Sequence, residues 1–182
     1  MSRAIPDRRE SDAPDGQSAP AGRTALAGRT RRGLEGGLLA TLVMTVYRLP
    51  ITRSLPPTAD FWAQFVGDGA PEDYPVPALV LHFAYGGTAG AVFAASLRGR
   101  ESVDPDEPGY DRRRGPPTYA GEVPITVAGL LYGLVLSAVG EQIVLGRLLD
   151  VDPDDRVAFH VGHVLYGITL GAWVGTRTTD RE

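Results

Sequence analysis

A ten-residue sequence occurs twice in this chain, each time inside an apolar segment long enough to cross a lipid bilayer. Residues 82–91 read HFAYGGTAGA and residues 163–172 read HVLYGITLGA, with six identities and no gap. A match of this kind within one chain marks a duplicated unit. Because each copy lies within about 20 mostly apolar residues, the pattern predicts a polytopic membrane protein.

A weaker match extends the duplicated unit to a second helix. Residues 37–45 read GLLATLVMT and residues 129–137 read GLLYGLVLS, which share G-L-L-x-x-L-V followed by a small hydroxyl residue. The unit is therefore a pair of helices that is used twice. We expect an all-α fold, a four-helix transmembrane bundle built from two helix-hairpin repeats.

Apolar residues are concentrated in four segments, although the mean hydropathy of the whole chain is only −0.08. The segments are residues 33–49, 76–97, 123–145 and 157–175, and together they define a membrane domain over 33–176.

The first segment is short and contains Glu35 and Arg48, but charges near helix ends can reach the membrane surface. It also follows Arg31-Arg32, as in a twin-arginine signal. We favour a basic flank on a spanning helix, because no small-residue cleavage site follows.

The arginines predict the orientation of this domain. Seven of the eighteen lie in residues 1–32, five in the loop 98–122 and two in the C-terminus 177–182, against four at the other side, counting the two remaining connections and Arg48 at the end of the first segment. Cytoplasmic loops carry the excess of basic residues. We therefore expect both termini and the middle loop in the cytoplasm, and the loop 51–75 outside the cell. Residues 1–32 contain few large apolar side chains, so this tail is predicted to be disordered.

Composition indicates a habitat and excludes several chemistries. Every basic residue is Arg, Asp outnumbers Glu by fourteen to eight, and the net charge is −4, as in the acid-rich proteome of a halophilic archaeon. The chain has no cysteine, which excludes disulfides, thiolate nucleophiles and iron–sulfur clusters. The expected partners are the lipid bilayer and either a second copy of the chain or another membrane protein. No nucleic acid is expected.

Glycines follow the repeated motifs at helical spacing. Gly86 and Gly90 lie on the same helix face as His82, and Gly167 and Gly171 on the face of His163. Small residues four positions apart let two helix backbones approach closely. We therefore predict that seven glycines lie at helix–helix contacts: Gly86, Gly90, Gly129, Gly133, Gly167, Gly171 and Gly175.

Ionisable side chains share one depth near the expected outer surface. They are Arg48, His82, Glu141, His160 and His163, and Tyr85 and Tyr166 follow the two repeated histidines by three residues. A charge at the centre of a membrane helix costs about 2.5–3.5 kcal/mol on insertion scales, so such groups face inward, form pairs or line a hydrated path. The sequence therefore predicts a polar site here, while helix packing alone is the competing explanation.

Three chemistries fit these residue types. A proton or ion path would use His and Glu side chains. A metal could be held by His82, His160, His163 and Glu141, and a haem by His82 and His163. We rank the hydrated polar site first, the metal second and the haem third, and we expect no cofactor.

The chain has no phosphate-binding loop, dinucleotide-binding, zinc-protease or serine-hydrolase motif, so we do not expect an enzyme.

With its two decapeptides and its loops rich in Arg and Asp, the helical region resembles small four-helix membrane proteins of unknown function that are common in halophilic archaea. The resemblance implies a location in the cytoplasmic membrane and no established activity. The leading hypothesis is a small transporter, channel or accessory subunit with a polar site. Two alternatives remain: a structural or partner-binding membrane module without ligand chemistry, and a metal- or haem-binding redox protein.

Overall fold

A computed structural model describes residues 18–97 and 122–179, and every regular element within these ranges is helical. The predicted all-α fold is confirmed. In chain order the elements are α1 (Ser18–Thr52), α2 (Thr58–Phe65), the short 3-10 helix η1 (Pro71–Asp73), α3 (Pro75–Ser96), α4 (Glu122–Val139), the π-helix η3 (Gly140–Leu149) and α5 (Arg156–Thr179).

Four helical stretches are long and apolar enough to cross a membrane, judged by length and composition. They are Arg23–Thr52, Pro75–Ser96, Val123–Leu149 and Arg156–Arg177. The third stretch combines α4 with the π-helix that continues it. Each stretch contains one of the four segments that the hydropathy pattern predicts, apart from Leu97 at the end of the second segment.

The start of α1 differs from the prediction of a disordered tail up to residue 32. The helix begins at Ser18, so residues 18–32 are helical. This stretch is rich in Ala and Arg, which favour a helix without burial of apolar surface. The small number of large apolar side chains therefore does not prevent a helix in this stretch, because its residues favour the helical backbone. Residues 1–17, 98–121 and 180–182 lie outside the described residues.

Prolines and left-handed residues mark the helix ends. Pro75 opens α3, and Pro124 lies in the first turn of α4, where a missing backbone N–H costs nothing. Arg53 follows α1 with φ 51° and Asp150 follows η3 with φ 56°. A left-handed residue just after a helix lets the chain turn away from the helix axis.

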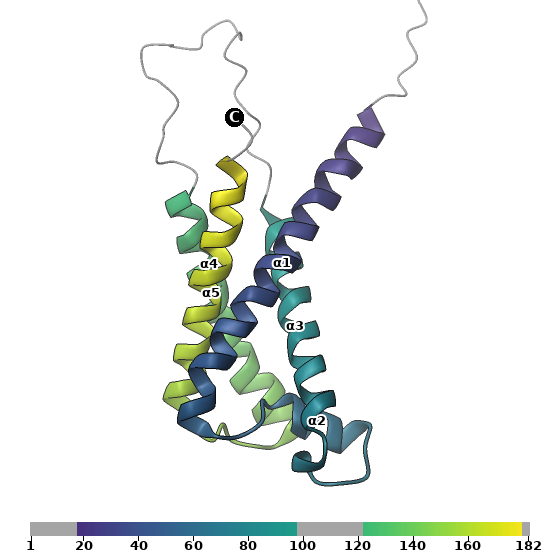
Figure 1. Cartoon of the computed structure of the whole chain (residues 1–182), viewed down its shortest axis with the longest axis vertical. Coiled ribbons are helices and arrows are strands. Elements are labelled where there is room, and N and C mark those ends of the chain that lie inside the picture. The colour runs from purple at the N-terminus through teal and green to yellow at the C-terminus, as the bar shows by residue number, and fades with distance from the viewer. Residues whose placement is uncertain (1–17, 98–121, 180–182) are drawn as a thin grey trace, which may run out of the picture.

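The long helices form two antiparallel pairs (Figure 1). α1 lies beside α3, and α4 lies beside α5, while α1 also packs along α5 and joins the two pairs. The short helix α2 covers the end of the bundle where α3 begins. We call this the α2 end; the N-terminus of α1 and the C-terminus of α5 lie at the opposite end.

Glycines bring the backbones of each pair into direct contact. A Cβ atom on Gly37 would overlap the carbonyl oxygen of Gly86, and one on Gly129 would overlap the carbonyl oxygen of Gly167. Only glycine fits at such approaches without moving a helix. Of the seven predicted glycines, five make backbone contacts of this kind: Gly90, Gly129, Gly133, Gly167 and Gly171. A Cβ on Gly86 would overlap the Thr41 hydroxyl instead, and Gly175 is buried in α5.

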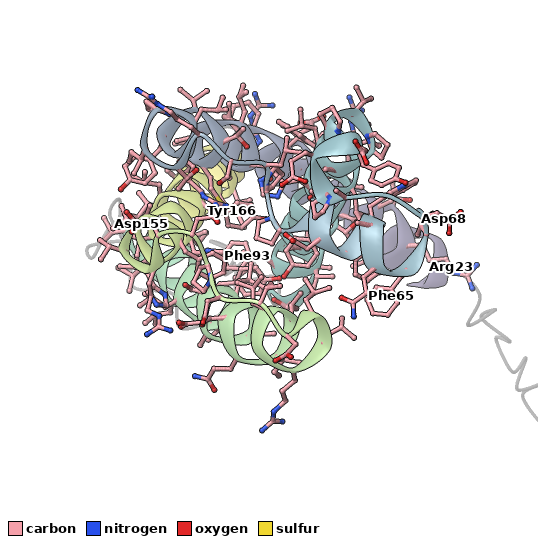
Figure 2. The ribbon with its side chains drawn as sticks, turned by 90° about the horizontal axis from the view of Figure 1, so that it is seen from below. Arg23, Phe65, Asp68, Phe93, Asp155 and Tyr166 are labelled. Atoms are coloured by element: carbon pink, nitrogen blue, oxygen red, sulfur yellow. The ribbon has the colours of Figure 1, made fainter. Side chains whose placement is uncertain are left out.

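Apolar and tyrosine side chains fill the space between the pairs. Phe93 and Tyr166 point into the middle of the bundle, whereas Asp68 and Asp155 lie at its periphery (Figure 2). The Tyr166 hydroxyl donates a hydrogen bond to the Gly86 carbonyl at 2.6 Å. The buried core comprises Ala40, Met44, Ala89, Phe93, Ala94, Tyr166, Leu170 and Val174. This hydrogen bond fixes α5 against α3 at the level of the close glycine contacts.

Candidate functional site

Polar side chains form a row between the π-helix and α5 at the α2 end. The Glu141 carboxylate lies 2.7 Å from Nε of Arg156 and 3.2 Å from Nε2 of His160. Nδ1 of His160 lies 2.7 Å from the Ser137 hydroxyl. If Nε2 carries the proton and donates to Glu141, Nδ1 accepts the hydrogen bond of Ser137. The carboxylate thus orients the imidazole.

This row is open to the surface at one end. Arg156 is exposed, whereas Glu141 and His160 are half-buried and Ser137 is buried. Glu141 lies in the first turn of η3. A π-helix is rare and often occurs at a functional site, because its wider turn moves side chains out of α-helical register. Glu141 lies in the π-helical segment, so its side chain is shifted from the position that an α-helix would give it.

His163 lies one turn further along α5 and is buried. Its Nδ1 donates a hydrogen bond to the Phe159 carbonyl at 2.9 Å, and its ring lies 4.5 Å from the Phe159 ring, measured between centroids. The other ring nitrogen, Nε2, is 3.9 Å from the position of a Cβ on Gly140. In the neutral imidazole Nε2 is therefore an acceptor.

Arg48 and His82 are two further buried polar residues at this end. Arg48 is 7% exposed and His82 is 8% exposed. Across residues 18–97 and 122–179, neither side chain forms a hydrogen bond or an ion pair, and Nε of Arg48 is fully buried. Arg48 and His163 are close enough to His82 for their charges to act on it. The three groups thus form one electrostatic cluster contributed by α1, α3 and α5.

Acidic residues surround the cluster at the periphery of the α2 end. The charges of Asp154 and Asp155 act on Arg48 from the connection before α5, but within the described residues neither carboxylate pairs with it. In α2, burial raises the pKa of Asp60, a nearby backbone hydrogen bond opposes this shift, and the charges of Asp154 and Glu72 raise the pKa further. The rim of the site is thus acidic, while its buried part is basic.

The predicted site residues divide into two connected groups and one outlier. Glu141 and His160 belong to the row, whereas Arg48, His82 and His163 form the buried cluster. Within the described residues, Glu141 forms ion pairs with Arg156 and His160 and none with His82 or His163. Tyr166 lies one turn further into the bundle and bonds to the α3 backbone. Tyr85 is 46% exposed and contributes to neither group.

Three residues that sequence reasoning did not select belong to this region or lie next to it. Ser137 precedes Glu141 by four residues, and Arg156 precedes His160 by four, so helical spacing alone could have indicated both. Tyr132 of α4 donates a hydrogen bond to the Ala89 carbonyl at 2.9 Å. Its bond crosses to the other helix pair, and no sequence pattern signals such a contact.

Among the described residues, no three His, Asp or Glu side chains are grouped so that they could hold a metal ion. His82, His160, His163 and Glu141, the predicted ligands, divide between the row and the cluster. The haem alternative at His82 and His163 stays an untested prediction.

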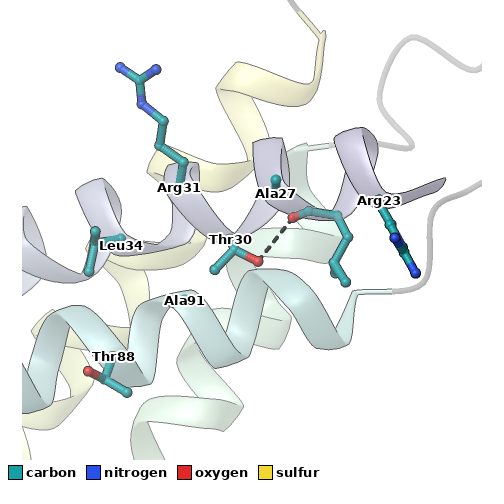
Figure 3. Close-up of a pocket in the computed structure, with 8 residues that line it drawn as sticks. Arg23, Ala27, Thr30, Arg31, Leu34, Thr88 and Ala91 are labelled. Carbon is teal, nitrogen blue, oxygen red and sulfur yellow. Dashed lines mark hydrogen bonds between the residues drawn. The ribbon is translucent and has the colours of Figure 1, made fainter. Parts of the chain in front are cut away.

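The opposite end of the bundle has a different character. Glu35 pairs there with Arg31 at 3.0 Å and with Arg177 at 3.7 Å, which ties α1 to α5. An open groove between α1 and α3 lies near this end and is lined mainly by small and apolar side chains with two arginines (Figure 3): Arg23, Leu26, Ala27, Thr30, Arg31, Leu34, Thr88 and Ala91. The groove is remote from the histidines.

Comparisons with protein-family models, with curated proteins and with solved structures found no match. The geometry described above is therefore the basis for a functional assignment.

Proposed function

We propose that this chain is an integral protein of the cytoplasmic membrane, of the kind found in halophilic archaea. Large apolar side chains are exposed along all four long helices, which favours a lipid environment over water. They include Leu42 and Val46 on α1, Val80 and Val92 on α3, Leu131 and Val135 on α4, and Val157 and Ile168 on α5. The polar groups, in contrast, lie between the helices or at their ends.

We further propose that the bundle consists of two helix-hairpin repeats. The sequence alignment equates Gly37 with Gly129, Gly86 with Gly167 and Gly90 with Gly171. Gly37 contacts Gly86 and Gly90, and Gly129 contacts Gly167 and Gly171. Equivalent residues thus make equivalent contacts in α1–α3 and α4–α5. This agreement supports a duplicated hairpin, because the sequence match and the contacts are independent observations.

Both termini should face the cytoplasm and the α2 end should face outward. We expect an impermeant thiol reagent to label Asp68→Cys in intact cells and to leave Pro105→Cys unlabelled until the cells are opened. The parent chain has no cysteine, so each variant carries a single reactive group. Labelling of position 105 with protection of position 68 would reverse the orientation.

The function that we propose is proton translocation by a small transporter or channel. The observation that carries it is the succession of polar groups from the paired Arg156, Glu141 and His160 at the surface to His163 and His82 in the core, where the charge of His160 acts on His163 and that of His163 on His82. Imidazoles and carboxylates can take up and release protons near neutral pH, and ionisable groups inside membrane proteins mark proton and ion pathways.

Proton flux into liposomes tests this function. With a potassium diffusion potential as the driving force and an internal pH-sensitive dye, wild-type protein should acidify the lumen faster than the leak of empty liposomes. Glu141→Gln should reduce the flux toward that leak, because the amide cannot carry a proton to His160. Asp68→Asn is the matched control, since Asp68 is exposed in the connection between α2 and η1 and belongs to neither group of the site.

A structural or partner-binding module is the second candidate. It is favoured by the bonds of His163 to the Phe159 carbonyl and of Tyr166 to the Gly86 carbonyl, which fix helices without any ligand. If wild-type protein and Glu141→Gln both conduct no better than empty liposomes, proton translocation is excluded and this second function is supported.

A further inference from the structure

The buried Arg48 side chain lacks a counterion among the residues that the structure describes. The side chain is 7% exposed, and its Nε is fully buried without a hydrogen-bond partner. Among the described residues its nearest electrostatic partners are Asp154 and Asp155, and neither forms an ion pair with it. An unpaired charge in an apolar interior costs several kcal/mol on general grounds. A group of this kind is maintained only where something else supplies the missing interaction.

The stem of Arg48 is held closely against α5 and Met44. Gly162 of α5 faces the arginine, and a Cβ there would lie 3.5 Å from Cδ of Arg48 and 3.2 Å from Cγ of Met44. The absence of a side chain at this position keeps the arginine stem against the helix, one residue before His163. His82 of α3, on which the charge of Arg48 acts, is 8% exposed and has no hydrogen-bond partner within the described ranges.

We propose that Arg48 and His82 form a binding site for a small carboxylate or another planar oxyanion, at the inner end of the polar row. A guanidinium presents parallel N–H donors on one edge, which match the two oxygens of a carboxylate. An imidazole N–H of His82 supplies a further donor. Met44 and Gly162 border the arginine closely, so the ligand is small, of the size of formate or acetate.

The chemistry of His163 links this site to proton movement. Its Nδ1 is committed to the Phe159 carbonyl, so that its Nε2 can only accept or take up a proton. An anion held by Arg48 favours the protonated form of a neighbouring imidazole. This step rests on the proposed function, because it makes the bound carboxylate the partner of the proton that enters along Glu141 and His160.

Acetate is the probe for the test, with purified protein in detergent. Replacing sodium chloride by sodium acetate at constant ionic strength should raise the melting temperature in a saturable manner, because a ligand that binds only the folded state stabilises it. In Arg48→Gln the acetate affinity should fall by roughly 10–100-fold, the value of one or two charge-assisted hydrogen bonds. Arg147→Gln, an exposed change on η3, should respond like wild type.

Arg48→Lys provides a second variant that keeps the charge. It should bind acetate more weakly than wild type, because an ammonium cannot form the paired contact. The site is refuted if folded wild-type protein shows no response to acetate, or if Arg48→Gln responds as wild type does. Since this binding is measured at equilibrium in detergent, it can fail while proton flux through liposomes persists, and the flux can fail while acetate still binds.

Discussion

Gly167→Ala is expected to separate α4 from α5 and to lower the melting temperature of the protein in detergent by many degrees. The new Cβ would overlap the carbonyl oxygen of Gly129, and it would lie 3.1 Å from the Gly129 carbonyl carbon and 3.1 Å from Cα of Gly133. These are backbone atoms, which cannot rotate away as a side chain does. The helices must therefore move apart, and overpacking costs about 1–3 kcal/mol even where side chains can adjust.

Gly28→Ala is the matched control for this change. Gly28 lies in α1, and a Cβ there would meet only Nη2 of Arg32, at 3.9 Å. The same substitution should be neutral or stabilising by up to about 1 kcal/mol, because alanine favours a helix more than glycine. Thermal unfolding followed by circular dichroism measures both variants. Equal melting temperatures would show that α4 and α5 do not touch at Gly167.

The helices could be predicted from the sequence wherever an apolar segment has a clear chemical boundary. Pro75 begins α3 one residue before the predicted start, and Arg156 begins α5 one residue before its predicted start. The start of α1 could not be placed in this way, since its first turns are not apolar. The π-helix at Gly140–Leu149 was also missed, because its hydrogen-bond register leaves no pattern in hydropathy.

The sequence predicts at which end of the bundle the polar residues lie, but not which of them form pairs. Counting residues along each helix indicates that Arg48, His82, Glu141 and the α5 histidines share one end of the bundle. Which of them meet depends on the rotation of each helix, and one residue turns an α-helix by about 100°. Glu141 therefore meets His160 rather than His163, and Tyr85 faces outward although it follows His82 by three residues.

Removal of the Arg48 charge should stabilise the empty protein. Arg48→Met keeps an unbranched side chain against Met44 and Gly162, and it removes a buried guanidinium that has no ion-pair partner within the described residues. Replacement of buried charged groups by apolar residues of similar volume is often stabilising, by about 1–4 kcal/mol. In a buffer without carboxylates, the melting temperature in detergent should therefore rise above that of wild type.

Arg147→Met tests whether the gain comes from the buried charge rather than from a greater apolar content. Arg147 is exposed on η3, so its replacement should leave the melting temperature nearly unchanged. If Arg48→Met is instead less stable than wild type while Arg147→Met is not, Arg48 already has a strong partner inside the folded protein. If the stability difference between Arg48→Met and wild type becomes smaller as acetate is added, Arg48 lacks a partner in the protein. Bound acetate then supplies the missing interaction and stabilises wild type alone.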